Sequence, residues 1–111
     1  MGEELETSCF QIISNVGAAR SSYIEAIEKA KAGDFDGARA CMEEGKKQFL
    51  IGHEVHFGLI QKEASGAQVA GSLLLIHAED QLMSAEGFKI IAEEMIASYE
   101  RITELEKKLQ G

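Results

Sequence analysis

No proline interrupts this chain of 111 residues, so the residue that most strongly breaks helices is missing throughout. Long, uninterrupted helices are therefore favoured. Apolar residues recur with alternating gaps of three and four, the spacing that places them on one side of a helix. A hydrophobic content of 45% is normal for a globular protein. Together these features predict an all-α fold.

The first helix is expected over about residues 3–31. Its apolar stripe consists of Leu5, Cys9, Ile12, Val16, Ala19, Tyr23, Ile27 and Ala30. Gly33 and Asp34 then mark a break, because glycine suits the left-handed position after a helix and aspartate caps the next one.

The second helix is expected over about residues 34–64. Its main stripe consists of Phe35, Ala38, Met42, Gly45, Phe49, Gly52, His56 and Leu59, and a second row adds Leu50, Ile51, Val55 and Ile60. Each interior glycine weakens a helix by roughly 1 kcal/mol. Close packing against neighbouring helices is the expected reason for Gly45, Gly52 and Gly58, whereas Gly17 in the first helix is a weaker signal of the same kind.

The third helix is expected over about residues 68–110, after a connection at residues 65–67. Its first half has two apolar seams. One seam begins His77, Gln81, Ser84, Phe88 and Ile91, and the other consists of Leu73, Ile76, Asp80, Met83, Gly87 and Ile90. A helix with two apolar sides needs more partners than two helices of one chain easily supply. We therefore expect a bundle that associates with copies of itself.

The length of the chain is enough for one domain, which we place over residues 1–111. The net charge of −8 argues against binding to nucleic acid or to an anionic membrane, although it suits plain solubility or a basic partner. No signal peptide or membrane span is visible, and Cys9 and Cys41 lie far apart. These features predict a cytoplasmic protein with reduced, structural thiols.

His77 stands with Asp80 and Gln81 in the middle of the strongest apolar pattern, where polar groups need partners. A core histidine satisfied by a hydrogen bond is one hypothesis. A metal site is another, but one helix supplies too few ligands by itself. The third is a nucleophilic histidine, because neutral imidazole can attack a phosphoryl group and hold it covalently.

His53 and His56 lie one turn apart, but their spacing is not that of the HExxH zinc motif. They are more simply core or groove-lining residues. No glycine-rich phosphate loop, GxSxG elbow or Cys/His catalytic pattern is present.

Residues 72–83 (SLLLIHAEDQLM) resemble the phosphocarrier motif of the lactose/cellobiose-specific enzyme IIA components of the bacterial phosphoenolpyruvate-dependent sugar phosphotransferase system (PTS). Residues 15–21 (NVGAARS), 32–35 (AGDF) and 59–64 (LIQKEA) resemble other segments of that family. The resemblance covers essentially the whole chain.

The resemblance implies a homotrimer of antiparallel three-helix subunits with a long third helix, nine helices in all. It implies that His77 accepts phosphate from the small carrier HPr and passes it to a cysteine of the IIB component during uptake of lactose, cellobiose or a related β-glycoside. It also implies that Asp80 lies at the trimer axis with a divalent cation, usually Mg²⁺. Carboxylates that converge on an axis do repel unless a hard cation bridges them, and an acidic carrier suits a basic HPr surface.

The chain departs from the family pattern at a few positions. Gln81 stands where a second histidine is usual, Ala18 replaces a glutamate, and His56 and Phe57 stand where glutamine and threonine are common. Gln61 and Gln81 are candidates for contacts in the groove beside the site. These departures leave the sugar open, and they also fit a paralogue with a regulatory use.

Two other classes remain open. One is a purely structural helical oligomer, in which His77 is a satisfied core residue. The other is a histidine phosphotransfer domain of two-component signalling. That class typically has lysine three residues after its histidine, and here that position is Asp80.

Overall fold

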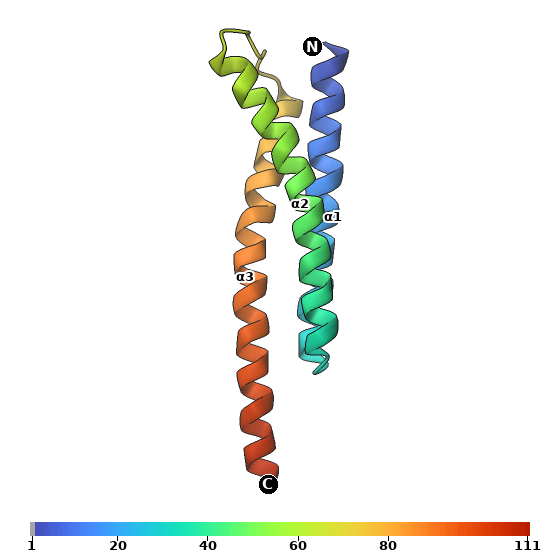
Figure 1. Cartoon of the computed structure of the whole chain (residues 1–111), viewed down its shortest axis with the longest axis vertical. Helices are drawn as coiled ribbons and strands as arrows, with labels where there is room; N and C mark the ends of the chain where they lie inside the picture. Colours follow the sequence, from blue (N-terminus) through green and yellow to red (C-terminus); the bar gives the residue numbers. More distant parts are fainter. Residues whose placement is uncertain (1) are drawn as a thin grey trace.

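The computed structural model describes residues 2–111, and these form three helices joined by two short connections (Figure 1). α1 spans Glu3–Lys31, α2 spans Phe35–Ala64 and α3 spans Leu73–Gln110. No strand occurs in residues 2–111. The predicted all-α, three-helix class is therefore confirmed for the single chain.

The three helices form an elongated bundle of 64 × 19 × 19 Å. α1 and α3 run in the same direction and α2 runs in the opposite direction, as Figure 1 shows. α3 is the longest helix, and its C-terminal part continues beyond the turn that joins α1 to α2 (Figure 1). Within residues 2–111, no helix is both long enough and apolar enough to cross a membrane.

The turn between α1 and α2 follows the expected chemistry. Gly33 has a φ of +86°, the left-handed conformation that glycine adopts without a steric cost. Asp34 caps α2, because its Oδ1 accepts a hydrogen bond of 2.9 Å from the Gly37 N–H. The predicted break at this turn is confirmed.

The start of α3 differs from the prediction. The helix begins at Leu73, five residues later than the expected start at about residue 68. α2 ends at Ala64, and Gly66, two residues later, has the left-handed φ of +100° that is common after the end of a helix. Ser72 then caps α3, because its Oγ accepts a hydrogen bond of 3.1 Å from the Leu75 N–H. The position of this cap decides where the turn that contains His77 begins.

α1 and α2 approach closely along their length. A Cβ atom on Gly45 would collide with the ring of Tyr23, and one on Gly52 would lie 2.8 Å from Cγ1 of Val16. These two glycines serve close packing, as predicted. The same prediction was wrong within the chain for Gly17 and Gly58, because no atom lies within 4 Å of a Cβ atom built on either.

The core is built around α1. Its buried members fall into two clusters along the bundle, one of Ala19, Tyr23, Ala26, Ala30, Ala38, Met42, Ala92 and Ile96 and the other of Cys9, Ile12, Val16, Ala78, Leu82 and Ala85. No polar or charged residue among residues 2–111 is buried. In α2 the second apolar row is largely outside this core, because Leu50, Ile51 and Ile60 are exposed.

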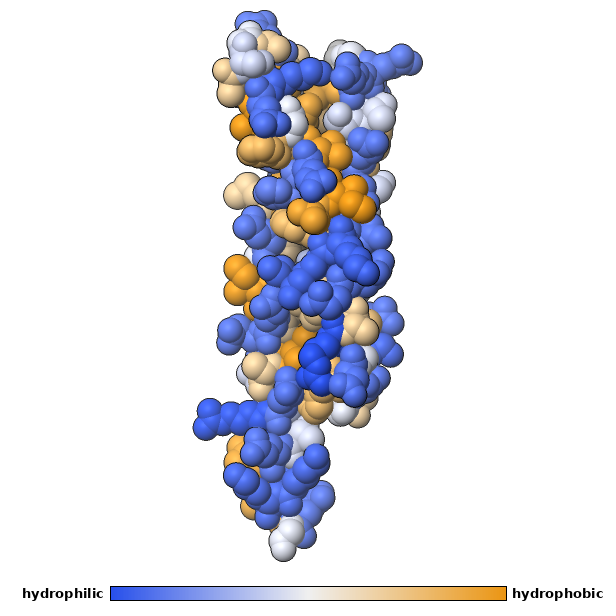
Figure 2. Space-filling model, in the orientation of Figure 1, coloured by the Kyte–Doolittle hydropathy of each residue, from blue (hydrophilic) through white to orange (hydrophobic). Residues whose placement is uncertain are grey.

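α3 contributes only one side to this core. The opposite side, which we call the outer face of α3, carries Leu73, Ile76, Asp80, Met83, Gly87 and Ile90. Met83 is 70% exposed and Ile90 is 60% exposed. In Figure 2, apolar side chains gather on the visible face over the end where the helices and the 65–72 connection meet, while hydrophilic side chains cover most of the opposite end.

Candidate active site

Packing against α1 determines the rotation of α3 about its own axis. Ala78, Leu82 and Ala85 are buried in the cluster that also contains Cys9, Ile12 and Val16 of α1. Successive residues of an α-helix are separated by about 100°. With Ala78 facing the core, His77 lies to one side of it, Glu79 to the other, and Asp80 points away.

His77 is exposed, although the sequence pattern suggested a place within the core. It forms no hydrogen bond or ion pair with any of residues 2–111. The ring lines a shallow apolar hollow of about 520 Å³ together with Leu73 and Leu74. The hypothesis of a buried histidine satisfied by a core hydrogen bond is therefore wrong for the single chain, and no hydrogen bond from residues 2–111 occupies either ring nitrogen.

Glu79 faces α2. Its Oε2 lies 2.8 Å from Nε2 of His56, which is half-buried. This contact holds the last third of α2 against α3 on the side that does not carry His77. His56 is thus a helix-contact residue, in agreement with the expectation that it lines a groove. His53, one turn earlier, is exposed and lies beside Phe49, with 6.0 Å between the ring centroids.

Gln81 faces α1. Nη1 of Arg20 donates a hydrogen bond of 3.4 Å to Oε1 of Gln81, which brings an arginine side chain to the turn after His77. Sequence reasoning placed Arg20 only inside a family-like segment and missed this contact, because no spacing rule connects two residues 61 positions apart. The arginine lies on the same side of α3 as His77, since His77 and Gln81 are one turn apart.

Asp80 is exposed on the outer face of α3, between Ile76 and Met83. One chain offers a cation a single carboxylate there, and no group of three or more His, Cys, Asp or Glu side chains suited to a metal occurs in residues 2–111. Repetition of Asp80 by symmetry would supply the oxygen donors that Mg²⁺ prefers. The donor type therefore fits the predicted cation only if copies of α3 meet along this face.

The remaining candidates lie away from His77. Gln61 is an exposed residue of the last turns of α2, the helix that contacts the Glu79 side of α3, so its role in the groove remains a prediction. Cys9 and Cys41 are free thiols. Burial raises the pKa of each thiol, with smaller contributions from Glu79 and Glu6 at Cys9 and from Glu25 at Cys41. Neither is therefore activated as a nucleophile.

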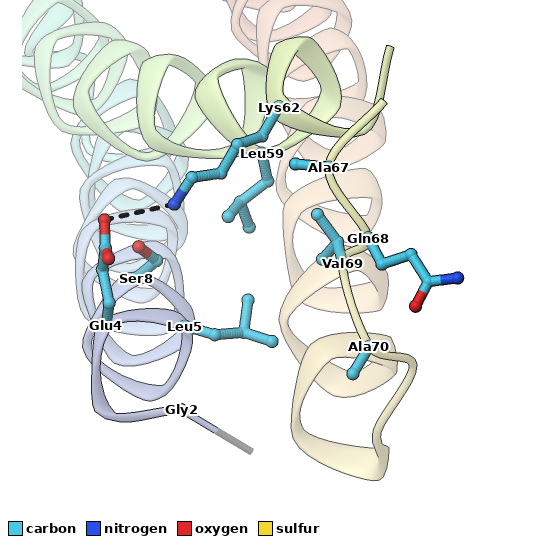
Figure 3. Close-up of a pocket in the computed structure, with 10 residues that line it drawn as sticks. All are labelled: Gly2, Glu4, Leu5, Ser8, Leu59, Lys62, Ala67, Gln68, Val69 and Ala70. Atoms are coloured by element: carbon cyan, nitrogen blue, oxygen red, sulfur yellow. Dashed lines mark hydrogen bonds and ion pairs between the residues drawn. The ribbon is translucent and has the colours of Figure 1, made fainter. Parts of the chain in front are cut away.

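A separate pocket of about 270 Å³ lies at the end of the bundle where α1 begins and α2 ends. Figure 3 shows Leu5, Leu59 and Val69 directed into it from three segments of the chain. Lys62 closes one side through a 3.2 Å ion pair with Glu4, also drawn in Figure 3. His77 is not among its lining residues, so this pocket is separate from the candidate site.

Residues 7–100 match the family described as "PTS system, Lactose/Cellobiose specific IIA subunit". The chain belongs to this family. As a IIA component of the lactose/cellobiose type, it is a phosphotransfer protein of the PTS. The phosphocarrier-like segment that contains His77 lies within the matched residues.

Individual relatives agree along nearly the whole chain. The lichenan-specific phosphotransferase enzyme IIA component of Bacillus subtilis is 43% identical over 104 residues, which is 94% of each chain. The crystal structure of the cellobiose-specific enzyme IIA of Bacillus anthracis has a TM-score of 0.89 at 39% identity, and covers 93% of this chain and 94% of its own. The IIA chain from the IIA(chitobiose)–HPr complex of Escherichia coli has a TM-score of 0.80 at 33% identity, with 92% and 99% covered.

Proposed function

We propose that this IIA component accepts a phosphoryl group from HPr on His77 and passes it to a cysteine of a IIB component. The observation that carries the proposal is the exposed ring of His77, without any partner in residues 2–111, on the family-like segment of α3. Exposure matters because both the donor and the acceptor are proteins, and each must bring its own reacting group to the imidazole.

The transfer requires one bond to form and one to break at each step. A lone pair of the His77 ring forms the new P–N bond, while the P–N bond on the donor histidine breaks and its electron pair stays on the donor nitrogen. In the second step the IIB thiolate attacks the phosphorus, and the electron pair returns to His77. Neither step needs an oxidant, a reductant or another co-reactant.

The proposed partners follow from charge and from the relatives. A structural relative was solved in complex with HPr, and a net charge of −8 favours association with a basic surface on such a carrier. The relatives include components named for lichenan, lactose and cellobiose. We therefore propose that the chain takes part in the uptake of lactose, cellobiose or a related β-glycoside. Its proposed location is the cytoplasm.

We further propose that three copies assemble through the outer face of α3. Exposed Ile76, Met83 and Ile90 form an apolar strip that a single chain leaves in water. Threefold symmetry would bring three copies of Asp80 together, where a divalent cation, Mg²⁺ by donor type, would neutralise their charge. The cation is assigned to offsetting the repulsion among the three carboxylates and takes no part in the transfer steps.

Incubation with phosphoenolpyruvate, enzyme I and HPr tests the proposal. We expect stoichiometric, acid-labile phosphate on the chain, and its loss in His77→Ala. His53→Ala is the matched control, because His53 is also an exposed histidine on a helix and should leave labelling unchanged. An unlabelled wild-type chain, or a labelled His77→Ala variant, would contradict the assignment and favour a structural oligomer.

A further inference from the structure

Arg20 is a cation to which residues 2–111 supply no carboxylate partner. The guanidinium donates to the neutral amide of Gln81, at 3.4 Å. It forms no ion pair with an acidic side chain in residues 2–111, whereas Arg39 on α2 lies 2.6 Å from Asp36 and 3.9 Å from Glu100. An amide orients a guanidinium without cancelling its charge. The charge of Arg20 is therefore available to a further anion.

The contact with Gln81 places that charge beside His77. Residues four apart on a helix have Cβ atoms about 5–6 Å from each other. Side chains on a helix also tilt toward its N-terminus, so Gln81 leans toward the turn that carries His77. Arg20, held at the tip of Gln81, is thus directed to the side of α3 on which the imidazole is exposed.

A phosphoryl group on His77 would need such a cation. A protein-bound phosphate carries a charge of roughly −1.5 to −2 near neutral pH. The chain around it is acidic, with Glu79 and Asp80 next along the helix and a net charge of −8 overall. A guanidinium matches phosphate oxygens with two parallel N–H donors, which makes arginine the most suitable side chain for this task.

We propose that Arg20 contacts the phosphoryl group carried by His77 and that Gln81 is the positioning residue that holds the guanidinium there. The inference rests on the proposed function, since it concerns the phosphorylated state of the same histidine. It assigns Arg20 to lowering the free energy of the phosphorylated form and of the transfer that leads to it. It also gives Gln81, which stands where a second histidine is usual, a defined part in the site.

The test is the phosphorylation equilibrium with phospho-HPr in the full-length wild type, Arg20→Gln, Arg20→Lys and Arg39→Gln. Loss of one hydrogen bond to a charged group changes an equilibrium constant by about tenfold to hundredfold. We expect Arg20→Gln to lower the equilibrium constant for phosphorylation of His77 by that factor. Arg20→Lys should restore part of it, and Arg39→Gln, at a distant ion pair, should match wild type.

A second measurement separates contact with phosphate from a merely structural role. The ³¹P resonance of phospho-His77 reports the titration of the phosphoryl group itself. A nearby guanidinium favours its dianionic form, so the titration midpoint should move to higher pH in Arg20→Gln and stay unchanged in Arg39→Gln. Arg20 is exposed, so these variants are expected to fold, and thermal unfolding followed by circular dichroism verifies this.

Gln81→Glu tests the positioning role by changing the group that holds the Arg20 guanidinium. The new carboxylate should strengthen the link to Arg20 but compete with phosphate for it, and it should lower phosphorylation without lowering stability. The effect of Gln81→Glu is measured both in the wild type and in Arg20→Gln. The direct repulsion between the new glutamate and the phosphate is present in both cases, so it cancels when the two effects are compared. The two substitutions should be non-additive if Gln81 acts through Arg20, and additive effects would overturn the positioning role.

The outcomes distinguish the inference from the function on which it rests. If the wild-type chain takes no phosphate on His77, the proposed function is wrong. If the wild type is phosphorylated while Arg20→Gln has the same equilibrium constant and the same ³¹P titration midpoint, the function stands and the role of Arg20 is wrong.

Discussion

The interface between α1 and α2 and the outer face of α3 are both built from apolar residues, but in the single chain the first is buried and the second is exposed. At the first, Val16 and Tyr23 are almost fully buried, and Gly45 and Gly52 allow the two helices to approach closely. At the second, Ile76 is 62% exposed. The difference teaches that the chain contains one apolar surface that its own fold completes and another that it leaves open.

The two surfaces also differ in their side chains. The closed interface combines glycine and alanine with a few large residues, which suits a fixed partner at short range. The outer face of α3 carries flexible or branched side chains around one carboxylate, Asp80. A charged group at the centre of an apolar strip is costly to bury unless it meets a compensating ion. This arrangement is what a symmetric assembly around a cation requires.

The largest expected effect comes from a charge on the open surface. Ile90→Glu should abolish assembly, because three carboxylates would be buried without a bridging ion. Analytical ultracentrifugation should show a trimer for the wild type and a monomer for the variant. Ile51→Glu, an equally polar change at an exposed isoleucine of α2, should remain trimeric.

The same face should respond in the opposite direction to removal of its own charge. Asp80→Leu should retain or strengthen the trimer and lose Mg²⁺ binding, measured by calorimetry, because the repelling carboxylates that hold the ion are gone. A wild-type chain that sediments as a monomer or dimer would contradict the proposed role of the outer face altogether.

A smaller effect is expected at high pH from the closed surface. Tyr23 is fully buried, its hydroxyl has no partner in residues 2–111, and burial, with a smaller contribution from Glu93, raises its pKa to about 12. Because the folded state holds this proton more tightly than the unfolded state, stability is complete below pH ~10 and falls as the pH rises toward ~12. The loss should approach about 2–3 kcal/mol, since one pKa unit corresponds to ~1.4 kcal/mol.

Urea unfolding between pH 8 and pH 11.5 measures this loss. Tyr23→Phe should remove most of the alkaline dependence, and should not destabilise the protein at neutral pH, because it deletes a buried hydroxyl that lacks a hydrogen bond. Tyr99→Phe is the control at a half-buried tyrosine and should leave the dependence in place. If the free energy of unfolding fell equally steeply with pH in the wild type and in Tyr23→Phe, water would have to reach Tyr23 at the interface between α1 and α2.

The smallest effect is expected from single methyl groups. Gly45→Ala should destabilise the chain by about 1–2 kcal/mol in urea unfolding, because the new Cβ collides with the rigid ring of Tyr23 and outweighs the gain in helix propensity. Gly58→Ala, which meets no atom within 4 Å, should instead stabilise it by up to ~1 kcal/mol. Equal effects at the two glycines would mean that the close approach of α1 and α2 is not tightly packed.

Much of the fold could be predicted from local chemistry. The absence of proline, the spacing of apolar residues and the Gly33–Asp34 pair were enough for three helices and their first turn. The start of α3 was placed too early, because residues 68–70 are compatible with a helix and only the hydrogen bond from Leu75 to Ser72 settles where the helix begins.

The candidate site could be predicted only in part. The segment that contains His77 is specific enough to indicate its chemistry, and the family match supports that class of function. The contacts of Gln81 with Arg20 and of Glu79 with His56 could not be predicted from the spacing of residues, because each joins residues on different helices. The hypothesis of a buried His77 was wrong for the single chain, because the buried side of α3 consists of residues that belong to neither predicted seam: Ala78, Leu82, Ala85, Ala92 and Ile96.

By itself, the sequence determined the helices, the turn at Gly33 and the identity of the histidine and carboxylate offered for chemistry, since these depend on neighbours along the chain. Only the tertiary structure decided which side of α3 meets α1, and therefore that His77 faces solvent and Gln81 meets Arg20 while Ala78 is buried. The physical reason is that helical spacing sets the angles between residues on one helix, whereas the packing of Ala78 and Leu82 against α1 sets the direction in which that helix points.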